Sequence, residues 1–234
     1  VQIVGSIVGR VGELHLFQRT PQWVLGAPNA PITPEEQATY REDPATMRAV
    51  RDELSKTFTE NFANAVVNAD SPILEMLENL CRMNLETVED PELRERLRPS
   101  YRAACKRLVI SPNFYQAIQQ PNAQLVTEGI ERIEAGGVRT RDGQLHELDV
   151  LVLATGFRVD RFMRPIHVIG RDGVDLDDVW AQGPSAYLAV SIPDFPNLFM
   201  LNGPNGPVGN FSLIEVAEMQ FAYIMQLIEA AAGG

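Results

Sequence analysis

The stretch IVGSIVGRVGELHLFQRT, residues 3–20, decides the fold. Its first half has an apolar side chain every four residues, at Ile3, Ile7 and Val11, which is the pattern of a short helix with one buried face. The apolar run Leu14–Phe17 that follows is typical of a strand. A helix followed directly by such a strand is the second half of a β-α-β unit, so the sequence predicts an α/β fold.

A helical region separates this unit from the rest of the chain. A proline-rich linker, residues 28–34, leads into a long amphipathic helix. The apolar side chains of that helix are spaced three or four apart: Met47, Val50, Leu54, Phe58, Phe62 and Val66. Two shorter helices start at Ser71-Pro72 and Asp90-Pro91. The inner face of the first of these holds Leu74, Leu77 and Cys81. The region carries many charges but no catalytic constellation, and we interpret it as a helical insertion.

α/β character returns after the insertion. The pattern predicts, in order, a strand at Arg107–Ile110, a helix at Phe114–Gln119, a strand at Gln124–Thr127, a hairpin over Val138–Leu148 that turns at Asp142-Gly143, and buried strands at Val150–Leu153 and Leu198–Leu201. A last helix starts at Ser212, where Glu215 completes a capping box. Its side chains expected to face inward are Ile214, Ala217, Phe221, Ile224 and Ile228.

The charge balance disfavours several classes of partner. The chain has 31 acidic and 20 basic residues, and the resulting net charge of -11 disfavours binding to nucleic acid or to an anionic membrane. No segment has the length and apolar character of a membrane span. Cys81 and Cys105 provide neither a disulfide framework nor metal-ligand spacing, and the histidines are scattered, so we expect no metal site. Two reduced thiols are typical of a cytoplasmic protein.

Arg19 and Thr20 are the first candidate binding residues. In a dinucleotide-binding fold, an acidic residue at the end of the second strand accepts from the ribose 2′-hydroxyl of NAD. Here a guanidinium and a hydroxyl take that place, and both can bind a phosphate. The pair therefore predicts NADPH in preference to NADH. The alternative is an arginine that is simply solvated at a strand end.

Lys106 and Arg107 are the second candidate pair. Two adjacent cations before a buried strand are unusual in an acidic chain. The lysine can add charge to the 2′-phosphate, while the arginine points the other way from an extended backbone and can stabilise a different anion. A solvated basic pair is the alternative. Cys105 beside them is either a thiol with a lowered pKa or an incidental one.

Two further candidates lie at the ends of predicted strands. Thr155 and Gly156 follow Val150–Leu153, at the carboxyl end where open α/β sheets bind ligands. The Gly/Pro/Asn-rich loop from Asn202 leads into the N-terminus of the last helix, which suits a partly negative group such as the edge of a reduced flavin. We assign its last residues, Asn210 and Phe211, to the cofactor as well. An ordinary turn and an ordinary capped helix are the alternatives.

Several motifs together carry a family resemblance. They are FQRTPQW (17–23), CKR (105–107), GVRTRDG (137–143), DVLVLATGF (149–157), FPNLF (195–199) and NGP (202–204). In this order they resemble the class B flavoprotein monooxygenases, and most closely the Baeyer–Villiger branch, which also has a helical insertion at this place. The resemblance covers nearly the whole chain. The ATGF motif is shared with other flavin- and nicotinamide-dependent enzymes, so the joint set is what makes the resemblance specific.

The resemblance implies a fold and a chemistry. The fold is the two-dinucleotide-binding-domain flavoprotein type, Rossmann-like. Residues 1–27 and 105–148 would form two parts of the NADPH-binding domain, 28–104 the helical insertion, and 149–234 the C-terminal part of the FAD-binding domain. Arg19, Thr20 and Lys106 would hold the 2′-phosphate, and Arg107 would be the catalytic arginine. Through a C4a-peroxyflavin, FAD and NADPH would support insertion of one oxygen atom from O2 into a ketone, giving an ester or lactone.

The sequence also departs from the family pattern. Both glycine-rich cofactor turns and the fingerprint between them are absent, so we expect a fragment that is incomplete at its N-terminus and inactive alone. The loop Gly203–Asn210 differs from the more serine-rich loop of cyclic-ketone enzymes, which leaves the substrate open. Three alternatives remain: an N- or S-oxygenating flavin monooxygenase, a flavin reductase without oxygenation, and a non-catalytic truncated paralogue that binds a partner.

Overall fold

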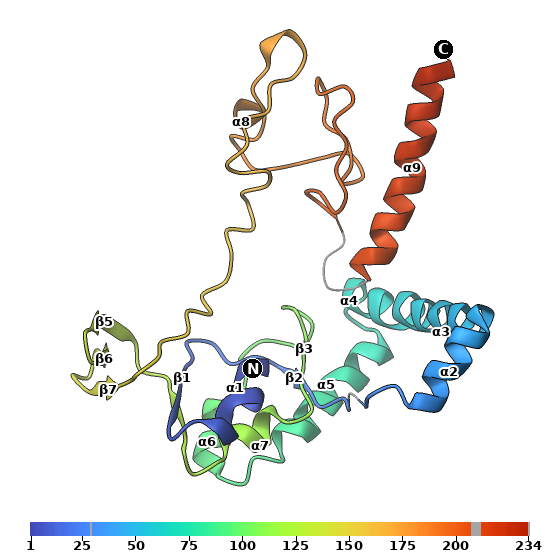
Figure 1. Cartoon of the computed structure of the whole chain (residues 1–234). Helices are drawn as coiled ribbons and strands as arrows, with labels where there is room; N and C mark the ends of the chain where they lie inside the picture. The colour runs from blue at the N-terminus through green and yellow to red at the C-terminus, as the bar shows by residue number, and fades with distance from the viewer. Residues whose placement is uncertain (29, 207–211, 234) are drawn as a thin grey trace. The chain divides into compact units, whose positions relative to one another are not determined.

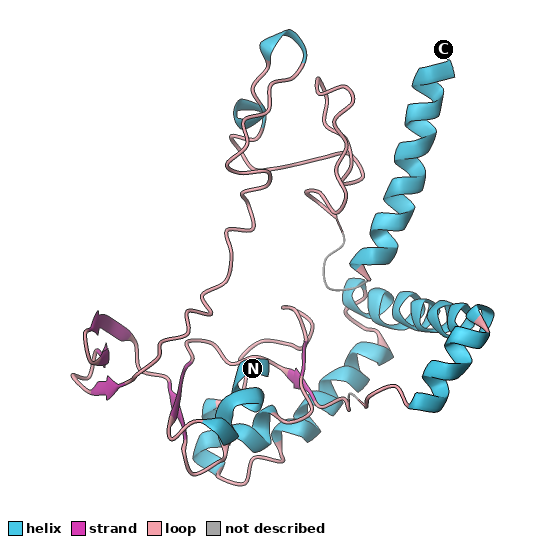
Figure 2. Ribbon diagram, in the orientation of Figure 1, coloured by secondary structure: helices cyan, strands magenta, loops and turns pink. Residues whose placement is uncertain are grey.

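The computed structural model describes residues 1–28, 30–206 and 212–233, and they form two compact units, Val1–Leu153 and Ala154–Gly234. Figure 1 labels most of the helices and strands in chain order, and Figure 2 distinguishes them from the loops. The first unit contains the helical region and all the named strands of the described chain, whereas the second is mostly loop with two α-helices.

The N-terminal part of the first unit has the predicted helix and strand. Helix α1 (Gln2–Ile7) continues as a 3₁₀ turn, η1 (Val8–Arg10), and leads to strand β1 (Leu14–Phe17). β1 pairs in parallel with β4 (Ala123–Val126), and α1 packs on helix α7 (Phe114–Ile118). A helix beside a parallel strand pair is the β-α-β arrangement, so the predicted α/β class is confirmed.

A second parallel pair joins segments that are far apart in the sequence. Strand β2 (Val24–Leu25) pairs with β3 (Val109–Ile110). The strand predicted from residue 107 therefore begins two residues later than expected. Because β2 has only two residues, it offers backbone partners to only the last part of the predicted strand.

The helical region consists of five α-helices and one π-helical segment among the described residues. They are α2 (Pro34–Glu42), α3 (Pro44–Thr57), the π-helical η2 (Phe58–Ala63), α4 (Asn64–Val67), α5 (Pro72–Leu85) and α6 (Pro91–Arg96). The run from α3 to α4 is the long helix predicted from its periodicity. Its apolar stripe is exposed within the described residues, since Met47 and Leu54 are 50% and 56% accessible.

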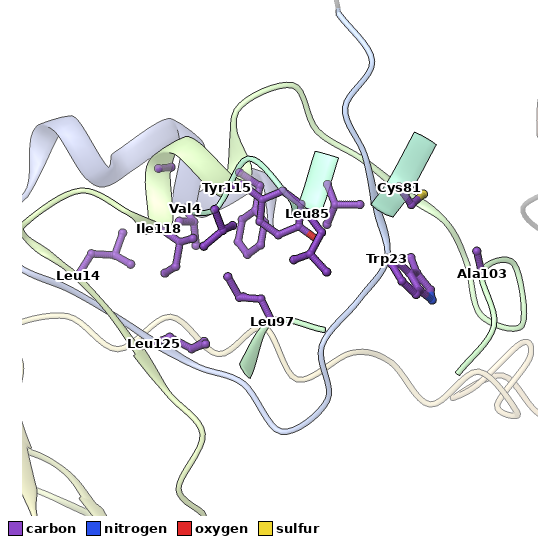
Figure 3. Packing of buried hydrophobic residues seen from close by; sticks show 14 residues of the cluster. Val4, Leu14, Trp23, Cys81, Leu85, Leu97, Ala103, Tyr115, Ile118 and Leu125 are labelled. Atoms are coloured by element: carbon purple, nitrogen blue, oxygen red, sulfur yellow. The ribbon is translucent and has the colours of Figure 1, made fainter. Parts of the chain in front are cut away.

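Helix α5 carries the core of the first unit. Its inward residues Leu74, Leu77 and Cys81 are buried as predicted, and Leu85 is fully buried. Figure 3 shows Leu85 and Cys81 in the same hydrophobic cluster as Val4 of α1 and Tyr115 of α7. The Asn84 amide also donates to the carbonyl of Val24 in β2, at 2.9 Å. The helical region and the parallel strands therefore share one core.

The rest of the first unit is a three-stranded antiparallel sheet. It contains β5 (Ile130–Glu134), β6 (Gly137–Thr140) and β7 (Leu145–Glu147), in that order. The predicted hairpin is β6–β7. Asp142 closes its turn by accepting from the Thr140 hydroxyl at 2.6 Å and from the backbone N–H of Gln144 at 3.1 Å, and Gly143 has φ +87°. A left-handed φ of this kind favours glycine.

A buried histidine connects this sheet to β1. His146 on β7 is 3% exposed, and its ring meets those of His15 and Phe17 edge-on at 5.2 Å between centroids. Burial, and next the neighbouring His15, lower the pKa of His146 below its usual 6.5, although Asp142 acts in the opposite sense. His146 is therefore neutral in the folded protein at neutral pH.

We expect acid to destabilise the protein through His146. The unfolded chain binds the proton more readily than the folded chain, so the stabilisation is complete above the unfolded pKa and is lost as pH falls below about 6.5. The melting temperature should fall between about pH 7.5 and about pH 5.5, and less steeply in His146→Gln. An unchanged slope in His146→Gln would contradict this role.

Two predicted strands are wrong. Residues 150–153 form no strand among the described residues, and Val150 and Leu153 are 73% and 70% exposed. Leu198–Leu201 contributes only a single bridge, between Ser191 and Phe199. A continuously apolar strand is stable only between two neighbouring strands, and the described residues provide no such neighbours for either run.

The second unit has a small core of its own. Leu176 of helix α8 (Leu176–Val179) is buried with Ile192, Phe195 and Met200. Its long helix, α9 (Leu213–Gly233), starts where predicted, and the Ser212 hydroxyl accepts from the Glu215 amide at 3.5 Å.

The predicted inner face of α9 is only partly right: Ile224 is buried and Ala217 is half-buried, whereas the other three predicted residues are exposed. The buried residues are Val216, Gln220 and Ile224, whereas Ile214 and Phe221 are 73% and 56% exposed. The reason is the side-chain amide of Gln220, which accepts from the backbone N–H of Asn202 at 2.7 Å and donates to the Leu188 carbonyl at 3.1 Å. These bonds turn a polar residue inward. No helix in the described part of the chain is both long and apolar enough to cross a membrane.

Candidate nucleotide-binding site

The first cationic position lies at the carboxyl end of a parallel strand. After β1, the Gln18 amide continues the pairing by donating to the Val126 carbonyl at 2.9 Å. Arg19 and Thr20 therefore follow the last paired residue, at the edge where parallel sheets bind ligands. Arg19 is exposed and Thr20 is half-buried. Within residues 1–28, 30–206 and 212–233, the Arg19 guanidinium has no hydrogen bond or ion pair, so it is available to a ligand.

The second cationic position lies in the loop before β3. Lys106 and Arg107 are both exposed. The Lys106 ammonium lies 4.6 Å from the centroid of the Tyr101 ring, a cation–π contact. Neither residue has an acidic partner among the described residues, although the chain has 31 acidic side chains. Lys106 and Arg107 therefore keep their positive charge available to a ligand, although the protein is acidic overall.

Tyr101 links the two cationic positions. Its hydroxyl donates to the Pro21 carbonyl at 3.2 Å and lies 3.1 Å from Oε1 of Gln22. Its own carbonyl accepts from the Trp23 indole at 2.6 Å. Burial raises the pKa of the Tyr101 phenol, which keeps the hydroxyl protonated as a donor near neutral pH. Together with the β2–β3 pairing, these bonds hold the segment after β1 against the loop that carries Lys106.

Sequence reasoning missed Tyr101. The two segments that it joins are about 80 residues apart in the chain, so no local pattern reveals the contact. The one available signal was an aromatic side chain close before the basic pair, since such rings often contact a cation.

The structure brings some of the predicted residues together within the first unit. Arg19 and Thr20 are linked through Tyr101 to the segment with Lys106 and Arg107. Thr155 and Gly156 belong to the second unit, where both are exposed and Gly156 has φ +89°. Asn210 and Phe211 lie outside the described residues. Cys105 is an exposed free thiol.

One group of possible metal ligands occurs in the second unit. Ligand atoms of His167, Asp175 and Asp177 all lie within 4.8 Å of one another. Asp175 caps α8 by accepting from the Asp177 amide at 2.8 Å, and Asp177 pairs with the Arg164 guanidinium at 2.7 Å. Helix capping and an ion pair thus account for both carboxylates, and Arg164 already supplies positive charge.

Curated proteins similar to this chain are monooxygenases. An uncharacterized monooxygenase of Mycobacterium tuberculosis is 46% identical over 231 residues, which are 98% of this chain and 46% of that protein. A Baeyer–Villiger monooxygenase of Pseudomonas aeruginosa is 33% identical over 98% of this chain and 43% of its own length. The chain thus spans less than half of these two relatives. No family model matches it.

The solved structures that resemble this chain include monooxygenases as well. A cyclohexanone-bound cyclohexanone monooxygenase has a TM-score of 0.82 and 32% identity, covering 99% of this chain and 52% of that chain. The complex of OTEMO with FAD and NADP has a TM-score of 0.80 and 27% identity, covering 100% and 50%. By sequence and by fold, the chain is similar to Baeyer–Villiger monooxygenases and to cyclohexanone monooxygenase, a two-dinucleotide-binding-domain flavoprotein, and it corresponds to about half of their length.

Proposed function

We propose that the chain belongs to an FAD- and NADPH-dependent monooxygenase that inserts one oxygen atom from O2 into a ketone to give an ester or lactone. The observation that carries the proposal is the set of exposed cations, Arg19, Lys106 and Arg107, on segments that Tyr101 and the β2–β3 pair hold together. The names of the similar proteins support the chemistry, because they include a structure with cyclohexanone and one with FAD and NADP.

In this proposal, the first unit recognises the 2′-phosphate of NADPH. Arg19 binds it with two parallel hydrogen bonds, Thr20 donates another, and Lys106 adds a point charge. Arg19 and Lys106 suit this phosphate because both side chains are exposed and have no acidic partner among the described residues. A carboxylate at position 19 or 20 would instead select the unphosphorylated ribose.

The proposed roles of the other residues concern FAD and the reacting oxygen. When bound, NADPH supplies a hydride to FAD, which then activates O2. Gly156 suits a cofactor contact, since its φ of +89° favours glycine and no atom of the described residues lies within 4 Å of where a Cβ would stand. Thr155, Asn210 and Phe211 are assigned to the same cofactor. Arg107 stabilises the negative charge that develops on the substrate oxygen, because its guanidinium stays protonated at any working pH.

The proposed partners are a small-molecule ketone and O2, without nucleic acid or membrane. The acidic balance, with a net charge of -11, supports the absence of nucleic acid. Two free cysteines, buried Cys81 and exposed Cys105, support a reducing compartment, and we propose the cytoplasm.

Arg19→Ala in the full-length protein is expected to raise the KM for NADPH by roughly tenfold or more, because a charged hydrogen-bonding partner of the 2′-phosphate is lost. The KM for NADH should stay within about twofold, since NADH lacks that phosphate. Steady-state oxidation of each cofactor, followed by its absorbance, measures both. Arg10→Ala, at an exposed arginine of η1, is the control. An equal rise for both cofactors would count against a phosphate site.

Product analysis tests the reaction itself. The full-length protein is incubated with NADPH, O2 and cyclohexanone or another simple ketone. We expect one ester or lactone for each NADPH oxidised. Consumption of NADPH without an oxygenated product would indicate a reductase, and oxygenation of amines or sulfides without reaction of ketones would indicate the N- or S-oxygenating class.

A further inference from the structure

Tyr101 contacts both sides of the proposed phosphate site without lying in the strand pair that joins them. Its hydroxyl binds the Pro21 carbonyl at 3.2 Å, next to Thr20. Its carbonyl receives the Trp23 indole at 2.6 Å, and its ring lies under the Lys106 ammonium at 4.6 Å. One half-buried side chain thus restrains both the segment that carries Arg19 and the side chain of Lys106.

The ring contact of Lys106 differs from an ion pair in its effect on the charge of the lysine. A lysine held by a carboxylate would lose most of its attraction for a phosphate. A ring face holds the ammonium while leaving its net charge and most of its N–H donors free. A free lysine side chain must lose rotamer entropy when it binds a ligand, and a lysine already restrained by a ring loses less. Tyr101 can therefore order Lys106 in advance without neutralising it.

We propose that Tyr101 is a positioning residue that sets the preference for a 2′-phosphorylated adenosine over an unphosphorylated one. It holds Lys106 and the residues after β1 where both meet the same phosphate. This inference rests on the proposed function only in its NADPH site and not in the oxygenation chemistry. Trp23 and the β2–β3 pair keep the two segments together in the absence of Tyr101, so its loss should affect ligand preference more than folding.

Binding of two simple probes tests the inference. Adenosine 2′,5′-bisphosphate carries the 2′-phosphate, and 5′-ADP lacks it. Calorimetric titration of the full-length protein with each gives the two dissociation constants. Tyr101→Phe keeps the ring under Lys106 and loses the hydroxyl contacts, so we expect roughly threefold weaker binding of the bisphosphate. Tyr101→Leu loses both contacts, and we expect roughly tenfold weaker binding. Binding of 5′-ADP should stay within about twofold in both.

Tyr115→Phe is the matched control. It removes the same hydroxyl from a tyrosine in the core of the first unit, whose own hydroxyl has no hydrogen-bond partner among the described residues. Both probes should bind this variant as they bind the wild type. If Tyr101→Leu unfolds, the conservative Tyr101→Phe still gives the test, since it keeps the ring and the Trp23 bond.

The possible outcomes separate the inference from the proposed function. Equal weakening of both probes, or unchanged bisphosphate binding in the Tyr101 variants, would overturn the positioning role alone. A wild-type protein that binds the two probes equally would overturn the phosphate site and this role together. A protein that shows the expected selectivity but makes no ester would leave the role of Tyr101 intact and refute only the oxygenation.

Discussion

Replacing Arg107 by alanine in the full-length protein is expected to lower the rate of ketone oxygenation about a hundredfold. Arg107 is exposed and has no ion pair among the described residues, so its charge is available to an anion that forms during the reaction. Stabilising such charge with a group already in place is often the largest single contribution to catalysis. Ester or lactone formation, quantified by gas chromatography at saturating NADPH, measures the loss.

Two further variants sharpen this test. Arg102→Ala removes an arginine whose charge is already paired with Glu78, at 3.5 Å, and it should leave the rate nearly unchanged. Arg107→Lys keeps the charge but not the planar fork of donors, so an intermediate rate is expected. If Arg107→Ala keeps ketone oxygenation at the wild-type rate, Arg107 is not the catalytic arginine.

Leu85→Ala is expected to lower the free energy of unfolding of the first unit by about 3 kcal/mol. Leu85 is 0% exposed at the end of α5, where it packs in the cluster that also contains residues of α1, β1 and α7. Removing its side chain loses the transfer free energy of the deleted groups and leaves a cavity. Urea unfolding followed by circular dichroism measures the change.

Met83→Ala is the control for that experiment. Met83 belongs to the same helix but is 68% exposed, so its loss should change the stability by less than about 0.5 kcal/mol. If the two variants lose equal stability, α5 does not share a core with the parallel strands, and the helical region is instead a separately folded piece.

Local signals in the sequence were sufficient for much of the fold. The helix and strand at residues 2–17 follow from spacing, and the starts of α5 and α6 follow from proline at the first turn. The β6–β7 turn follows from Asp142-Gly143, where a side-chain acceptor and a left-handed glycine act within a few residues. Each of these features depends on groups that are close in the chain.

The errors concern features that depend on distant neighbours. An apolar run such as Val150–Leu153 becomes a buried strand only if other strands cover it, and the composition of the run cannot say so. The inner face of α9 is decided by Gln220, whose amide binds backbone groups of residues 188 and 202. Periodicity assigns a glutamine to solvent, because it cannot anticipate two backbone partners.

In the candidate site, too, the residues could be recognised from local sequence, whereas the contact that joins them could not. Arg19 and Lys106 were recognisable because cations at a strand end and before a strand suit a phosphate. The NADPH preference was predicted from Arg19 and Thr20 themselves, whereas the catalytic role of Arg107 came from the family resemblance, and all these roles stay proposals. The link between the two cations was not visible, since Tyr101 reaches Pro21 across 80 positions of sequence.

The exposed apolar run at residues 150–153 has a practical consequence for handling the 234-residue chain. Val150, Val152 and Leu153 are all more than half accessible, and their backbone belongs to no sheet among the described residues. Such a segment is a template on which another molecule can add a strand. Solutions of the chain should therefore aggregate as the protein concentration rises. The substitution Val152→Lys places a charge in this segment and should keep the chain soluble.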